Sequence, residues 1–113
     1  MNALIVDDED PARVELRFLL RSHPQVRVVA EAATLGQARE ALARHRIDIV
    51  FLDIHLLGED GLDLGPELPA SARVVVVTGD DAQRTRAARL GKVDFLLKPV
   101  EPAALASALG TAR

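Results

Sequence analysis

Five polar side chains directly follow four short apolar runs, and their types suit phosphoryl chemistry. The side chains are Asp7, Asp8, Asp53, Thr78 and Lys98, and the runs before them span residues 3–6, 49–52, 74–77 and 93–97. Carboxylates are ligands that Mg²⁺ prefers, and a carboxylate can itself attack phosphorus to form an aspartyl-phosphate. A hydroxyl and an ammonium can neutralise charge on a transferring phosphoryl group. If the four run ends meet in space, the sequence predicts a site for a divalent metal and a phosphoryl group.

The apolar runs are typical of buried parallel strands, and the segments between them are typical of helices. We expect strands at residues 3–7, 26–30, 47–53, 73–77 and 93–97. Strict alternation of strand and helix indicates an α/β fold with right-handed crossovers. Such strands fit a flavodoxin-like, doubly wound five-stranded parallel sheet in the order 2-1-3-4-5, with helices on both faces. The first and third strands are then neighbours at the topological switch point, so Asp7, Asp8 and Asp53 should lie together.

The first helix has a clear start signal and two apolar stripes. Asp10 is expected to be its N-cap, with Pro11 at the first helical position. One stripe should pack on the sheet. The other, which carries Val14 and Phe18, is expected to pack on a neighbouring helix.

Capping residues and helix-breaking Gly and Pro residues predict where the other helices begin and end. Thr34 and Gln37 resemble a capping box for the second helix. The third helix should be short because Gly65-Pro66 interrupts it. The fourth is expected at about residues 80–91, and the fifth begins near residue 101.

Length and composition indicate one globular domain over residues 1–113. Of these residues 49% are hydrophobic and 27% are charged, which is ordinary for a globular chain and excludes a disordered one. The net charge of -3 argues against direct binding of nucleic acid, and the absence of cysteine excludes disulfides and thiol catalysis. No apolar run approaches the roughly 20 residues of a membrane span, and no secretory signal is visible. The expected location is the cytoplasm.

Each polar residue at a strand end also has a purely structural interpretation. An aspartate there is often a helix N-cap, Lys98-Pro99 is a common way to end a strand, and Thr78-Gly79 alone is typical of a turn. Asp53 is harder to explain in this way because it ends the most hydrophobic strand. All of these features fall at strand ends in the right order, and this joint pattern favours a functional site.

The residues at these strand ends closely resemble the receiver domain of two-component response regulators, and the resemblance covers essentially the whole chain. The matching segments are Leu4-Ile5-Val6-Asp7-Asp8-Glu9, Val50-Phe51-Leu52-Asp53-Ile54, Asp60-Gly61, Val77-Thr78-Gly79 and Asp94-Phe95-Leu96-Leu97-Lys98-Pro99. The second and last segments are most similar to receivers attached to LytTR DNA-binding domains. The resemblance implies that a histidine kinase or phosphotransfer protein donates a phosphoryl group to this chain, with Mg²⁺ as cofactor.

The resemblance assigns the acceptor and the metal ligands. It implies that Asp53 is the phosphoacceptor and also a metal ligand. Asp8 would bind Mg²⁺ directly and Asp7 through water, and the backbone carbonyl of His55 would complete the protein ligands. The chain would catalyse its own phosphorylation and dephosphorylation without turning over a separate substrate.

The remaining implied roles concern the phosphoryl group and the output. Thr78 and Lys98 would contact the phosphoryl oxygens, and the Lys98–Pro99 peptide would be cis. Phe95 would be the switch aromatic, turning inward when Thr78 moves toward the phosphoryl group. Phosphorylation would then reshape the face formed by the fourth helix, the fifth strand and the fifth helix. That face would bind an output domain, a second receiver or a target protein.

The chain departs from the family pattern at three places. Leu56-Leu57 stands where Met-Pro is common, and Lys92 stands where a small residue is usual beside the output face. Gly65-Pro66 is expected to shorten the third helix. None of these changes removes a predicted catalytic group. The His55 side chain has two interpretations: it hydrogen-bonds the phosphoryl group or tunes attack by water, or it is an exposed loop side chain whose carbonyl alone matters. We favour the second.

Three other functions share parts of this pattern. An atypical receiver would bind partners without phosphorylation, although the intact acidic set, Thr78 and Lys98 argue against it. A phosphatase with an aspartate nucleophile typically carries a second Asp two residues further on, where this chain has His55. A flavin-binding flavodoxin would share the fold alone, and the acidic residues after the first strand would repel a flavin phosphate.

Overall fold

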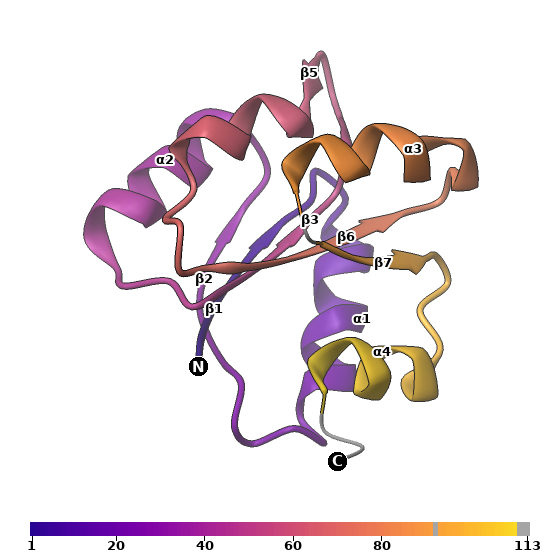
Figure 1. The fold of residues 1–113 in the computed structure, drawn as a ribbon. Coiled ribbons are helices and arrows are strands. Elements are labelled where there is room, and N and C mark those ends of the chain that lie inside the picture. The colour runs from indigo at the N-terminus through magenta and orange to yellow at the C-terminus, as the bar shows by residue number, and fades with distance from the viewer. Residues whose placement is uncertain (92, 111–113) are drawn as a thin grey trace.

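The protein contains a five-stranded parallel sheet with helices on both faces, seen in a computed structural model that describes residues 1–91 and 93–110 (Figure 1). The sheet strands are β1 (Asn2–Val6), β2 (Arg27–Ala32), β3 (Ile49–Leu52), β6 (Arg73–Thr78) and β7 (Asp94–Leu97). They lie in the order β2-β1-β3-β6-β7, and each neighbouring pair is parallel. Numbered along the chain, these strands have the order 2-1-3-4-5, so the predicted flavodoxin-like fold is confirmed.

The helical elements divide between the two faces of the sheet. They are α1 (Asp10–Leu20), α2 (Leu35–Arg44), η1 (Gly61–Glu67), η2 (Asp81–Gln83), α3 (Arg84–Ala87), η3 (Ala88–Leu90) and α4 (Pro102–Leu109). Successive strand residues point to opposite faces. Val6 and Val50 therefore join one core cluster with apolar residues of α2, η1 and α3. Ile5 and Phe51 join a second cluster with residues of α1 and α4 (Figure 1).

Two expectations for α1 are wrong. The helix begins at Asp10, its N-cap is Glu9, and no side chain accepts a capping hydrogen bond there. Asp10 lies in the first turn, where the helix dipole favours a negative charge, and pairs with Arg13. The second apolar stripe does not pack on a neighbouring helix: Val14 is 54% exposed and Phe18 is 61% exposed, because the opposite stripe of the helix is the one that faces the sheet.

The caps of the second and fourth helical regions follow their sequence signals. Thr34 Oγ1 accepts a hydrogen bond from the Gln37 N–H at 3.0 Å, as a capping residue should. The Gln37 side chain accepts one from the N–H of Ala33, one residue before the cap. Asp80 caps η2 by accepting from the Ala82 N–H at 3.0 Å, and Gly91 ends η3 with a φ of +93°.

Helix-breaking residues shorten the third and fourth helical regions. η1 is a short 3₁₀ segment with Pro66 inside it, as the Gly65-Pro66 pair predicts. The fourth region is a succession of η2, α3 and η3, in which only four residues are α-helical. Lys92, which the sequence analysis singled out, lies outside the described residues. Within the described ranges, no helix is both long and apolar enough to span a bilayer.

A small hairpin follows Asp53, at the place where Leu56-Leu57 departs from the pattern that the sequence otherwise resembles. It consists of β4 (His55–Leu56) and β5 (Glu59–Asp60), which pair antiparallel, and Gly58 takes a φ of +71° in the turn. Its Leu56 is buried, whereas Leu57 is 88% exposed at the tip. Gly61 directly after the hairpin is required by space, because a Cβ there would overlap the carbonyl oxygen of Asp53.

Candidate functional site

The carboxyl ends of β1, β3, β6 and β7 meet at one edge of the sheet, as expected from the strand order. The Asp53 N–H donates to the Val6 carbonyl at 2.9 Å, which extends the pairing of β3 with β1. The Lys98 N–H donates to the Thr78 carbonyl at 2.8 Å, which extends the pairing of β7 with β6. The sheet register therefore fixes Asp53, Thr78 and Lys98 at the carboxyl edge, where all three line one cavity.

A single ammonium group lies among three carboxylates at the centre of the site. Lys98 Nζ is 2.7 Å from Asp7 Oδ2, 2.9 Å from Asp53 Oδ2 and 3.4 Å from Glu9 Oε1. Asp7 and Asp53 are each only 5% exposed. Charges so far removed from water need an opposite charge and hydrogen bonds, and Lys98 supplies both.

Backbone amides hold the other oxygen of each buried carboxylate. Asp7 Oδ1 accepts from the Glu9 N–H at 2.9 Å, and Asp53 Oδ1 accepts from the His55 N–H at 3.0 Å. Each carboxylate therefore has one oxygen held by its own loop and the other by Lys98. This arrangement orients the Asp53 carboxylate.

The electrostatics of the centre are set by burial and by shared charge. Burial raises the pKa of Asp53 above its usual value, although the hydrogen bond and charge of Lys98 oppose this shift. Burial alone would lower the pKa of Lys98, but its hydrogen bonds with Asp7 and Asp53 outweigh burial and raise that pKa. Lys98 is therefore a permanent cation at neutral pH.

The acidic side chains provide an oxygen set that fits a hard divalent cation. Asp7, Asp8, Glu9 and Asp53 each offer one carboxylate oxygen, and these oxygens all lie within 4.8 Å of one another. Oxygen-only ligands suit Mg²⁺, which usually keeps several waters and takes few carboxylates. Glu9 was not predicted as part of this cluster, although its position directly after Asp7 and Asp8 at the end of β1 was a signal.

A cavity of about 360 Å³ opens over the buried Asp53 carboxylate. It is lined by Asp8, Glu9, Asp53, His55, Thr78, Gly79, Asp80 and Lys98. Thr78 is 1% exposed as a residue and its Oγ1 lies 3.4 Å from the Asp80 N–H. From the sequence Asp80 was expected only to cap a helix, and in the structure it also forms part of the wall of the site.

Phe95 lies on β7, which neighbours β6 on the side away from β3. It is half-buried against the core cluster that includes Val76. The guanidinium carbon of Arg84 lies 4.3 Å from the centroid of its ring, which is a cation–π contact. The peptide between Lys98 and Pro99 is cis.

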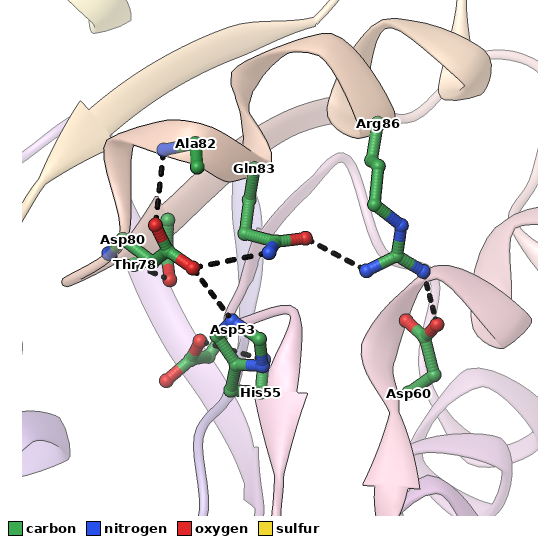
Figure 2. A network of polar contacts seen from close by, with 8 residues as sticks. All are labelled: Asp53, His55, Asp60, Thr78, Asp80, Ala82, Gln83 and Arg86. Carbon is green, nitrogen blue, oxygen red and sulfur yellow. Dashed lines mark hydrogen bonds and ion pairs between the residues drawn. The ribbon is translucent and has the colours of Figure 1, made fainter.

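Figure 2 shows that polar contacts continue from the mouth of the site into the segment formed by η2, α3 and η3, which we call the α3 region. His55 Nε2 lies 3.4 Å from Asp80 Oδ2, and the Gln83 amide donates to the same oxygen at 3.1 Å. Arg86 donates to Gln83 Oε1 at 2.7 Å and pairs with Asp60 on β5. The His55 side chain is exposed, as the favoured interpretation has it, but it also contacts a wall of the site.

Comparison with known proteins agrees with this geometry. Residues 3–110 match the family described as the response regulator receiver domain. The chain is 41% identical over 104 residues to the sensory transduction protein LytT of Enterococcus faecalis, covering 89% of this chain and 43% of LytT. The chain thus spans less than half the length of that relative.

Solved structures show the same fold. The response regulatory domain of protein mrkE from Klebsiella pneumoniae superposes with a TM-score of 0.86 at 26% identity, covering 98% of this chain and 93% of that one. A CheX-CheY-BeF₃-Mg²⁺ complex from Borrelia burgdorferi gives a TM-score of 0.84 at 26% identity, covering 99% and 88%.

The family follows from these matches together with the fold. The chain belongs to the response regulator receiver domain family. The similarity to LytT agrees with the subfamily that the strand-end segments resemble.

Proposed function

We propose that this chain is the phosphoacceptor receiver of a two-component phosphorelay. A histidine kinase or phosphotransfer protein donates a phosphoryl group to Asp53, in a reaction that depends on Mg²⁺. The observation that supports this proposal is the buried Asp53 carboxylate, whose Oδ2 lies 2.9 Å from the Lys98 ammonium in a cavity also lined by Thr78. Membership of the receiver family supports the same reaction.

The transfer exchanges one bond to phosphorus for another. A carboxylate oxygen of Asp53 attacks phosphorus, and the bond from phosphorus to the donor histidine nitrogen breaks. That nitrogen keeps the electron pair, and the product is an acyl phosphate on Asp53. Lys98 and the Thr78 hydroxyl are the groups of this chain that neutralise charge on the phosphoryl oxygens. Hydrolysis later restores the carboxylate, with water as the attacking group.

The donor set of the site fits Mg²⁺. Asp8 and Asp53, with Asp7 through water and the backbone carbonyl of His55, are the groups that would hold it. When bound, Mg²⁺ supplies positive charge to the phosphoryl oxygens. The acidic side chains would hold the ion, and Lys98 offsets the repulsion between the buried carboxylates of Asp7 and Asp53.

The output is proposed to be the face formed by the α3 region, β7 and α4. Thr78 ends β6 and Phe95 lies on the adjacent β7, so movement of Thr78 toward a phosphoryl group would open space for Phe95. An output domain, a second receiver or a target protein would read the change. Since the chain matches 43% of LytT, a DNA-binding output domain of the LytTR kind is the partner we propose first.

Chemical trapping tests the identity of the acceptor. The protein is incubated with phosphoramidate and Mg²⁺ and then reduced with borohydride, which converts an acyl phosphate of aspartate to homoserine. Homoserine at position 53 is the expected result. Trapping at another aspartate, or none at all, would contradict the proposal and favour a receiver that binds partners without phosphorylation.

A further inference from the structure

A continuous set of polar contacts runs from the β4–β5 hairpin at the phosphoacceptor cavity, through the α3 region, and back to the same hairpin (Figure 2). His55 contacts Asp80, Asp80 accepts from Gln83, Gln83 accepts from Arg86, and Arg86 pairs with Asp60. The contacts cross four elements. His55 belongs to β4 and Asp60 to β5, while Gln83 belongs to η2 and Arg86 to α3. We refer to these five residues as the polar latch.

We propose that the polar latch restrains the α3 region in the unphosphorylated protein, and that a phosphoryl group on Asp53 releases it by displacing Asp80. Arg86 is the central positioning residue, since it is the group that fastens α3 to the hairpin. The inference rests on the proposed function and adds to it a regulatory connection made by this chain's own residues.

Asp80 is placed to respond to charge at the acceptor. Its side chain lines the same cavity as Asp53, and its carboxylate is exposed rather than buried. The carboxylate accepts hydrogen bonds from the Gln83 side chain at 3.1 Å and from the Ala82 N–H at 3.0 Å, which hold it at the mouth of the cavity. An acyl phosphate on Asp53 carries about two negative charges at pH 7 where the carboxylate carries one, so phosphorylation adds about one, and like charges at the mouth of a cavity repel.

His55 gives the same response a second cause. It follows Asp53 by two residues, and its ring contacts the Asp80 carboxylate at 3.4 Å. A phosphoryl group on Asp53 would offer the ring a competing anionic acceptor. Loss of the His55 contact and repulsion of Asp80 act in the same direction, since both weaken the hold of the hairpin on η2.

Arg86 carries the restraint to the far side of the α3 region. Its side chain is 36% exposed and that of Asp60 is 38% exposed, so their ion pair is less screened than a fully exposed pair. Asp60 also accepts from the Leu62 N–H at 3.0 Å, which anchors its carboxylate to the start of η1. Asp60, the last residue of the latch, is therefore held in place within the hairpin.

Thermodynamic reciprocity makes the proposal measurable. If a phosphoryl group opens the latch, then opening the latch by mutation must favour occupancy of the phosphoryl position. Beryllium trifluoride with Mg²⁺ is the probe, because it mimics a phosphoryl group on a carboxylate and binds reversibly. Arg86→Met breaks both contacts of Arg86, and Asp60→Asn removes the charge of its partner while an oxygen remains to cap Leu62.

The experiment measures the midpoint of beryllium trifluoride binding at saturating Mg²⁺ from the ¹⁹F signals of bound fluoride. Arg86→Met and Asp60→Asn are each expected to bind about 5-fold more tightly than the unmodified chain, and the double variant no more tightly than Arg86→Met alone. Arg89→Met is the matched control, since it removes the same charge from an exposed position on η3.

The outcomes separate this inference from the proposed function. Unchanged or weaker binding by both single variants would overturn the latch while the unmodified chain still binds the probe. If Arg89→Met binds beryllium trifluoride more tightly by the same factor, loss of a positive charge alone explains the effect, and the latch is also overturned. No binding by the unmodified chain would instead contradict the proposed function itself, and the latch with it.

Discussion

The Lys98 ammonium lies 2.9 Å from the Asp53 carboxylate, and this ion pair joins the end of β7 to the end of β3. The same ammonium lies 2.7 Å from Asp7, so one cation serves two buried carboxylates. The centre is therefore short of positive charge by its own construction. An incoming cation relieves that shortage, which is why the acidic site is suited to a metal.

The first prediction concerns removal of the cation. Lys98→Met leaves Asp7 and Asp53 buried beside each other without a counter-charge. The free energy of unfolding at pH 7 should fall by about 3 kcal/mol, as for breaking a buried ion pair. Urea denaturation measures the loss. Arg46→Met, at a side chain that is 89% exposed, is the control and should change stability by less than about 0.5 kcal/mol. Equal stability of the two variants would contradict this picture.

The second prediction concerns pH. Because the pKa of Asp53 is raised in the folded state, its ionised form weakens folding at neutral pH. That penalty shrinks as the pH falls from the raised pKa to the ordinary pKa of aspartate, and below the ordinary pKa the carboxyl is neutral in both states. Asp53→Asn should therefore increase the free energy of unfolding at pH 7 by about 1 kcal/mol, and the gain should vanish below the ordinary pKa of aspartate.

Denaturation at a series of pH values measures this difference. Asp63→Asn, at an exposed position on η1, is the control and should show no such trend. A gain that grows as the pH falls would have the wrong sign for a raised pKa and would refute the assignment.

The third prediction concerns the metal. Mg²⁺ should raise the melting temperature of the unmodified chain, because a ligand that binds only the folded state adds about 2.7 kcal/mol at 100 times its Kd. Asp8→Asn removes a proposed direct ligand and should weaken the apparent affinity about tenfold or more. Asp10→Asn removes the same charge from an 83% exposed position on α1. If both variants lose the metal response equally, general electrostatic attraction explains it better than a site.

The fourth prediction concerns the contact of Arg84 with Phe95. The guanidinium over the ring should hold Phe95 in its half-buried position with about 0.5–1 kcal/mol. The chain has three phenylalanines and neither tyrosine nor tryptophan, so 4-fluorophenylalanine labelling gives three ¹⁹F signals. In Arg84→Met the Phe95 signal alone should shift, and in Arg89→Met none should. An unmoved Phe95 signal in Arg84→Met would mean that the contact does not position the ring.

The sheet and the centre of the site were predictable because short apolar runs determine both. A buried parallel strand has a sequence signature, and the residue after each strand must lie at the carboxyl edge. Asp7, Asp53, Thr78 and Lys98 could therefore be brought together from the sequence alone. Their hydrogen-bond partners required the structure.

Features that depend on loop conformation were not predictable in this way. Asp80 follows Thr78 by two residues and has a capping signal, but its place on the cavity wall depends on how the loop after β6 turns. The contact between Arg86 and Asp60 joins residues 26 apart, whose elements meet only in three dimensions. The exposure of Phe18 was missed because a second apolar stripe on α1 has the same period whether or not a neighbour covers it.

Intact-mass spectrometry after incubation with acetyl phosphate tests the central claim most directly. With Mg²⁺, the unmodified chain is predicted to gain the mass of a single phosphoryl group, and Asp53→Asn is predicted to gain none. Without Mg²⁺, the adduct should be absent or strongly reduced. An adduct of the same stoichiometry on Asp53→Asn, or no adduct on the unmodified chain, would contradict the account.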